Sequence, residues 1–171
     1  MIAIFLSQTN FLAAGLSFNF TSCTAGDLNI SHERAFPVEQ AIQLANSMIG
    51  ANDKTNFGRA TYCKSMHLWD KASSNLTNFQ THFSFVIDSK SKFQYGDGLT
   101  FFLAPEGEHV GIDINSLKSV KNITWFCDIK EGKRNDAWIS YNSSTHNLSV
   151  VFTGNDTLAM QYLSVIVDLR D

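Results

Sequence analysis

The sequence predicts an all-β protein, an antiparallel sandwich, and three observations support that fold class. Apolar and polar residues alternate with a period of two in several short runs, which is the pattern of half-buried strands. Turn-forming residues lie between the runs. The 171 residues include 14 Phe and only 2 Pro, a composition that suits pleated strands. Many short strands at this spacing favour two antiparallel sheets packed face to face.

The strands are expected where the alternation is clearest. In order along the chain these runs are residues 16–20, 79–87, 110–114, 148–152 and 163–169. Turn residues occur between them at 73–75, 142–144 and 154–156. One further stretch is ambiguous. Apolar residues between Val38 and Met48 recur at helical spacing, so the residues alone support a helix and a strand equally there.

Length and composition indicate one domain, residues 15–171. The chain is long enough for one core and shows no internal repeat or Pro-rich linker. A net charge of −3, with both signs mixed along the chain, gives no footprint for nucleic acid or an anionic membrane. No run approaches the roughly 18 apolar residues of a membrane span. Residues 1–14 resemble a degraded signal segment, because residues 7–10 interrupt its apolar stretches and no basic residue precedes them.

Cysteines and glycosylation sequons bear on the compartment. Cys23, Cys63 and Cys127 lie far apart without zinc-ligand spacing, and we expect them to be buried small side chains. One disulfide with a free thiol is the alternative. Asn-x-Ser/Thr sequons favour a secreted or cell-surface glycoprotein with several solvent-facing Asn residues. They begin at Asn19, Asn29, Asn75, Asn122, Asn142, Asn147 and Asn155.

Eight phrases carry a resemblance to one family. They are residues 16–20 (LSFNF), 58–62 (GRATY), 68–70 (LWD), 78–87 (NFQTHFSFVI), 95–105 (YGDGLTFFLAP), 109–116 (HVGIDINS), 137–142 (AWISYN) and 148–150 (LSV). In this order they resemble the legume lectin (L-type lectin) domain, most nearly the ectodomain of plant lectin receptor-like kinases. The resemblance implies a concanavalin A-like jelly-roll sandwich and a strand at 41–44. It also implies an internal deletion and a C-terminal truncation, and so an incomplete sandwich.

The resemblance further implies a sugar site within residues 95–105. In the family, the Asp of Gly-Asp-Gly, here Asp97, accepts hydrogen bonds from sugar hydroxyls, and the neighbouring Gly98 permits the backbone that presents it. Bound calcium and manganese position that Asp, and calcium needs several carboxylate oxygens. The acidic segment that supplies them in the family is missing here between Pro105 and His109. We therefore expect neither metal to be bound.

Two residues match what is left of the family's transition-metal site. His109 corresponds to the imidazole ligand, and Ser119 to a residue that reaches the metal through water. A lone histidine without carboxylate partners binds a metal poorly, so His109 is read first as a surface or strand-end residue. Glu106 and Glu108 flank it and would provide only a weak improvised site.

The predicted function is binding of neutral glycans by a non-catalytic legume-lectin-like module, impaired by the missing acidic segment. Two alternatives stay open: a non-binding storage, defence or structural relative, and the non-functional product of a damaged gene or gene model. An enzyme is disfavoured, because no G-x-S-x-G nucleophile motif occurs and the resemblance implies no catalysis. Sheet edges exposed by the truncation would allow a homo-oligomer to form.

Overall fold

The regular elements of the protein are strands. The computed structural model describes the backbone of residues 2–7 and, with side chains, residues 16–20, 29–45, 57–64, 66–91, 98–103, 121–123, 125, 129–154 and 160–170. The strands are β1 (Ile2–Ser7), β2 (Ile30–Glu33), β3 (Phe36–Val38), β4 (Ala41–Gln43), β5 (Arg59–Tyr62), β6 (Phe79–Ile87), β7 (Arg134–Asn142), β8 (Asn147–Thr153) and β9 (Met160–Ile166). The all-β prediction is confirmed. The described residues include no helix that could cross a bilayer.

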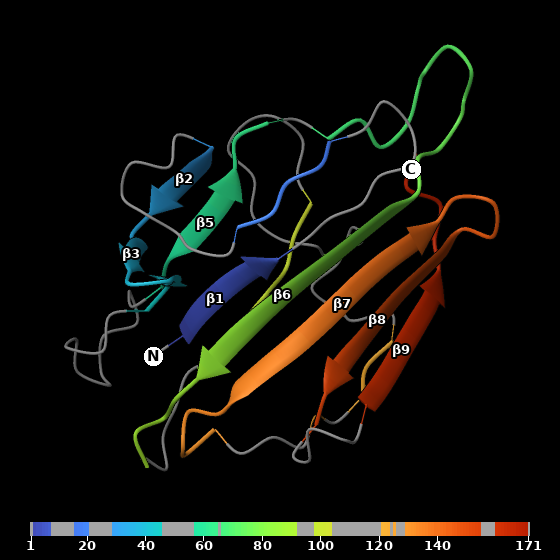
Figure 1. Cartoon of the computed structure of the whole chain (residues 1–171). Coiled ribbons are helices and arrows are strands. Elements are labelled where there is room, and N and C mark those ends of the chain that lie inside the picture. The colour runs from blue at the N-terminus through green and yellow to red at the C-terminus, as the bar shows by residue number, and fades with distance from the viewer. Residues whose placement is uncertain are drawn as a thin grey trace.

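Seven strands form one sheet and two form another. The large sheet has the order β3-β4-β1-β6-β7-β8-β9, and the small one pairs β2 with β5. Every pairing is antiparallel. Figure 1 shows β1 and β6 to β9 side by side in one twisted sheet, with the β2–β5 pair beyond β1. Among the described residues, β3 and β9 are the outermost strands of that sheet.

The period-two alternation of β6 and β7 divides the large sheet into a core face and an outer face. On the core face the two strands contribute one apolar cluster, made of Phe79, Phe83, Phe85, Ala137, Ile139 and Tyr141. On the outer face they carry mainly polar residues, namely Gln80, His82, Ser84, Arg134, Asp136, Trp138 and Ser140. The alternation seen in the sequence therefore assigns the core correctly, because side chains on a strand point to opposite faces in turn.

A smaller cluster joins the two sheets. It contains Ile30, Ala35, Ile42 and Leu44, with Leu99 packed against both this cluster and the main one. Gly58 lies just before β5, where a Cβ atom would stand 2.2 Å from the carbonyl oxygen of Leu44. A side chain at position 58 would thus collide with backbone, so glycine is required for this close approach.

The ambiguous stretch at 38–48 contains a strand. β4 spans Ala41–Gln43 and pairs with both β1 and β3, which confirms the strand that the family resemblance implies. Its burial explains why the spacing misleads. All three residues of β4 are buried, so the strand has no exposed polar face to reveal a period of two.

One expectation for the N-terminal part differs from the structure, and a second stays untested. Residues 16–20 show the expected alternation of burial but are not assigned to a strand. Instead, Phe18 and Phe20 pack against Tyr62, with ring centroids 4.1 and 5.8 Å away. Part of the segment 1–14, read from the sequence as a degraded signal, forms β1 between β4 and β6. Whether that segment is removed stays a prediction.

Two further expectations concern the C-terminal run and the cysteines. Of the run at 163–169, β9 takes the residues up to Ile166, after which Val167 and Leu169 pack against the main cluster. Cys63 is exposed and has a free thiol, so its predicted burial is wrong. It follows the last residue of β5 at a bend, where its N–H donates to the Asn29 carbonyl. The run at 110–114, Cys23 and Cys127 lie outside the described residues.

Candidate functional site

The segment that contains Gly98 lies on the core face of the large sheet. Leu99, Phe101 and Leu103 alternate along it and all pack against the main cluster. The Phe101 ring stacks on Phe83 of β6, with centroids 5.9 Å apart and planes inclined by 9°. Figure 1 shows residues 98–103 in yellow, crossing the large sheet near β6. Three apolar anchors thus fix the chain that leads out to the predicted sugar site.

Gly98 marks the point where this segment leaves the core. It is exposed and has φ +113°. A Cβ atom there would meet nothing within 4 Å, so glycine is needed for the backbone conformation and not for space. The next residue toward the N-terminus, Asp97, lies outside the described residues. The positive φ of Gly98 agrees with the backbone expected there, and the roles of Gly98 and Asp97 in sugar binding stay predictions.

Trp125 also packs against the main cluster, and the sequence did not point to it. Its indole N–H donates to the Thr153 carbonyl at 2.9 Å. Its ring is tilted against Phe85 at 5.5 Å and meets Phe152 edge-on at 6.3 Å. The available signal was a tryptophan within the short apolar run at 123–127. A large ring with one polar atom suits such a position, where its N–H finds a partner.

The described residues do not provide a metal site. No group of three His, Cys, Asp or Glu side chains gathers among them. His109, Ser119, Glu106 and Glu108 lie outside the described residues. A calcium site needs six to eight oxygens, several from carboxylates, and the described part of the chain does not supply them. The described side chains therefore do not form a site for the calcium and manganese of the family. That this chain binds neither metal stays a prediction.

The outer face carries a polar cluster around Asp136. Its Oδ1 lies 2.9 Å from His82 Nε2, and it accepts a hydrogen bond from Ser84 Oγ. The Arg134 guanidinium donates to Ser84 Oγ at 2.6 Å, while the His82 ring stacks on Trp138 at 4.7 Å. Serine, histidine and aspartate thus meet here, but not as a nucleophilic triad. Both Ser84 and the imidazole contact the same carboxylate oxygen, and Ser84 is 0% exposed.

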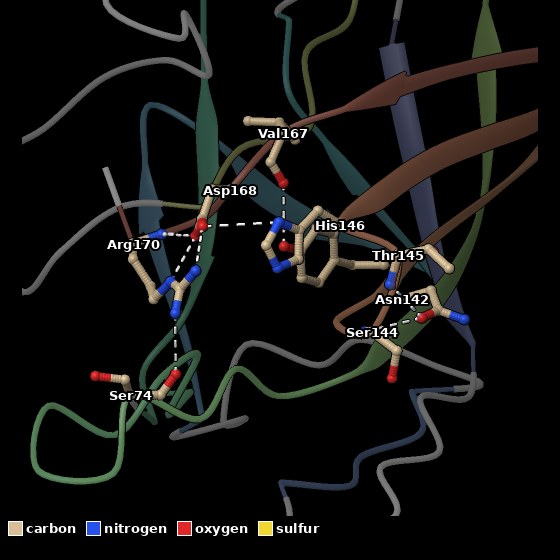
Figure 2. Close-up of polar contacts among 9 residues, drawn as sticks. Ser74, Asn142, Ser144, Thr145, His146, Val167, Asp168 and Arg170 are labelled. Atoms are coloured by element: carbon tan, nitrogen blue, oxygen red, sulfur yellow. Dashed lines mark hydrogen bonds and ion pairs between the residues drawn. The ribbon is translucent and has the colours of Figure 1, made fainter.

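The segment after β9 is fastened to two neighbouring loops. Asp168 pairs with Arg170 and lies 3.7 Å from His146 Nδ1, in the β7–β8 turn. Arg170 also donates to the Ser74 carbonyl at 3.2 Å, as Figure 2 shows. Hydrogen bonds from Arg170 lower the pKa of the Asp168 carboxyl to about 2.

The seven sequons differ in exposure. Asn19, Asn75, Asn122 and Asn142 are exposed, Asn29 and Asn147 are partly buried, and Asn155 lies outside the described residues. Nothing in the structure tests their occupancy, so glycosylation stays a prediction. The exposures show only which Asn residues the folded chain leaves open to solvent.

Comparisons with known proteins bear on these same residues. The sequence profile of the legume lectin domain matches residues 15–108 and 105–171. A lectin of Lens culinaris subsp. culinaris is 29% identical over 166 residues, which cover 69% of this chain and 60% of the lentil protein. The chain thus spans about 60% of the length of that relative.

Solved structures agree with the profile. Peanut lectin with a nine-residue peptide has a TM-score of 0.74 and 26% identity, and the match covers 92% of this chain and 84% of that one. Basic winged bean lectin with Tn-antigen has a TM-score of 0.71 and 22% identity, covering 95% and 82%. The predicted jelly-roll sandwich is confirmed. The names of these proteins agree with the prediction that the chain is not an enzyme.

Proposed function

Because the chain belongs to the legume lectin family, we propose that it is a carbohydrate-binding module whose site is built around Asp97 and Gly98. The backbone of Gly98 carries this proposal, since its positive φ and exposure are what a loop presenting Asp97 to a sugar requires. Three apolar anchors behind it, Leu99, Phe101 and Leu103, hold the base of that loop in place. A preformed site of this kind loses less conformational freedom when it binds.

The expected ligands are neutral sugars. Their hydroxyl groups need fixed hydrogen-bond partners, which a carboxylate on an anchored loop provides. Tn-antigen is named with the similar winged bean lectin, and we extend only the ligand class, neutral glycans, to this chain. Since the chain spans about 60% of the lentil lectin, sugar preference is a separate question for measurement.

We further propose that this binding is weakened and does not depend on calcium or manganese. The family profile matches in two pieces that meet at residues 105–108, the stretch where the sequence lacks the family's acidic segment. Without those carboxylates the chain would hold Asp97 only through its own backbone packing. Weak binding is the expected consequence, because part of the preorganisation supplied by the metals is lost.

A glycan array with the full chain tests both statements. We expect weak retention on neutral glycans, loss of it in Asp97→Ala, and no change on adding a chelator. Ser143→Ala, in the β7–β8 turn and outside the segment around Gly98, is the matched control. Retention that survives Asp97→Ala would remove Asp97 from the site. Retention that disappears with the chelator would show that metal binding has been kept.

One alternative is favoured by the same missing segment: a non-binding storage, defence or structural relative. A protein that is folded by circular dichroism and retained on no glycan would support it. Transcript sequencing through Pro105–His109 and beyond Asp171 would separate either function from a damaged gene or gene model. If the transcript contains coding sequence for an acidic strand that this chain lacks, a damaged gene or gene model would be favoured.

We also propose a secreted or cell-surface location, on the strength of the sequons and of the receptor-like-kinase resemblance.

We also propose that the chain forms a homo-oligomer through an outer strand of the large sheet. Three large apolar side chains of edge strand β9 are exposed, Met160 at 54%, Tyr162 at 56% and Ile166 at 69%. Light scattering after size exclusion should show a dimer that Ile166→Lys dissociates, because a charge blocks edge pairing. A monomeric native chain would exclude it.

A further inference from the structure

A polar groove lies on the outer face of the large sheet, near the β7–β8 turn. It is an open depression with a volume of about 390 Å³. Phe79 and Tyr141 border it, but their side chains belong to the core on the opposite face. The side chains that line the groove are therefore polar: Asn78, Gln80, Ser140, Asn142, Asn147 and Ser149.

Two of the seven sequons begin at residues of this groove. Asn142 is the last residue of β7, Asn147 is the first of β8, and the two are direct partners in the strand register. Side chains of such partners lie about 5 Å apart at Cβ. A glycan on one Asn would consequently cover the other, so the two sequons are alternatives.

The local contacts favour Asn142. Its Oδ1 accepts hydrogen bonds from the N–H groups of Ser144 at 3.0 Å and Thr145 at 3.2 Å. These bonds fix the amide, and Figure 2 shows its nitrogen on the side away from those N–H groups. Both Asn142 and the hydroxyl-bearing third residue of this sequon, Ser144, are exposed.

The contacts disfavour Asn147. Its side chain is partly buried and hydrogen-bonds to the Tyr162 hydroxyl on β9, where Ser164 and then Asn147 lower the pKa of the phenol. The third residue of this sequon, Ser149, lies within β8 and has its Oγ 2.8 Å from Ser140 Oγ. Both ends of the second sequon are thus already engaged in the folded sheet.

We propose that Asn142 is N-glycosylated and that the first sugar residues of the glycan lie in the polar groove. The donor is a lipid-pyrophosphate-linked oligosaccharide of the secretory pathway. The amide Nδ2 forms a bond to C1 of the first N-acetylglucosamine and loses one proton, while the C1–O bond breaks and the lipid pyrophosphate leaves with its electron pair. The groove offers amide and hydroxyl groups that both donate and accept, as sugar hydroxyls require.

The proposal requires passage through the secretory pathway and does not depend on the sugar site at Asp97. The two proposals can fail independently. The glycan array tests sugar binding at Asp97, and the mass of the secreted chain tests glycosylation of Asn142. Seating in the groove would also shield part of the outer face of β6 to β8. The glycan would then belong to the folded surface instead of extending into solvent.

The full chain, secreted from a eukaryotic host behind a host leader, tests attachment by glycopeptide mass mapping. We expect a glycan on Asn142 and none on Asn147. Ser144→Ala should remove that glycan while keeping the backbone N–H that caps Asn142. Ser143→Ala, which retains the sequon, and Ser149→Ala, which removes the second one, should leave it unchanged. An unmodified Asn142, or a glycan on Asn147 instead, would overturn the proposal.

Enzymatic release of the glycan tests whether its first sugar residues lie in the groove. With peptide N-glycosidase, removal from native protein should be about tenfold slower than removal from unfolded protein, the factor that one or two retained hydrogen bonds provide. Gln80→Ala, an exposed substitution on β6, should restore fast release without changing the melting temperature. Equal rates of glycan release from native and unfolded protein would contradict the proposed position of the glycan in the groove.

Discussion

The two faces of strands β6 and β7 are stabilised in different ways, one by apolar packing and the other by hydrogen bonds between polar side chains. On the core face, Phe83 and Phe85 pack against the segment that leads to Gly98 and against Trp125. On the outer face, Ser84 and Asp136 are partly or fully buried polar groups that satisfy one another. The core face is thus held by burial of apolar area and the outer face by specific hydrogen bonds.

This difference explains why the sequence pattern predicts the apolar face and not the hydrogen-bonded cluster. Apolar packing tolerates approximate geometry, so a pattern of alternating residues is enough to predict it. A hydrogen-bonded cluster depends on which side chains meet across strands, and this requires the register. His82 lies opposite Trp138, and Ser84 opposite Asp136, only because β6 and β7 pair as they do.

The largest effect is expected from the core face. Phe83→Ala removes a ring that packs on Phe85 and Phe101, and it should lower the free energy of unfolding by about 3–5 kcal/mol. Urea denaturation measures the change. Gln80→Ala, on the outer face of the same strand, should stay within about 0.5 kcal/mol. Similar losses in both variants would mean that the two faces are not distinct.

A smaller loss is expected from the polar cluster. Asp136→Ala leaves Ser84, which is 0% exposed, without its acceptor, and should cost about 1–3 kcal/mol. Ser84→Ala in that background removes the hydroxyl whose proton has lost its acceptor and should recover part of the loss. The double-mutant cycle is measured by the same denaturation. Strictly additive losses would show that the two side chains do not act together.

The effect at Gly98 should be smaller still in stability and larger in binding. Gly98→Ala places a Cβ at φ +113°, which costs about 1–2 kcal/mol for an L-residue in left-handed backbone. The strain should also displace Asp97 and abolish glycan retention. Thr100→Ala, exposed in the same segment, is the control for both readouts. Retention unchanged in Gly98→Ala would separate this glycine from the sugar site.

The smallest effect should come from Asp168, whose side chain is partly exposed, so that solvent and salt screen its charge. Its pKa is lowered from 3.8 to about 2 in the folded protein. Its contribution to stability is therefore complete above pH 4 and is lost as the pH falls toward 2. Thermal melts of the native chain and of Asp168→Asn should converge over that window, and less difference should remain in high salt. A constant gap between the two would assign the effect to another group.

Prediction from sequence succeeded where a period or a phrase was sufficient. Residues 79–87 were placed as a strand, and β4 was placed within 41–44 through the family resemblance. It failed where position depends on distant partners. Residues 16–20 have the pattern of a strand but pack by their rings against Tyr62.

The candidate site divides in the same way. Gly98 was predicted from the Gly-Asp-Gly phrase, and its backbone agrees with the prediction. Trp125, which supports the same core, was not predicted, because its partners Phe85 and Thr153 come from other parts of the chain. Nor did the sequence predict that Asn142 is exposed and Asn147 partly buried, since this depends on the contacts that each side chain makes in the folded sheet.

The place of β1 has a consequence for the order of assembly. The β7–β8 hairpin closes a short turn between Asn142 and Asn147, whereas β1 pairs Ile2 with Ile87. Closing the second loop fixes far more chain before any contact is gained, so we expect it to form late. Pulsed hydrogen exchange would show β7 and β8 protected before β1, and simultaneous protection would refute this order. Until β1 docks, β3 and β4 have no ladder to the rest of the large sheet, and one edge of β6 stays open to any other strand.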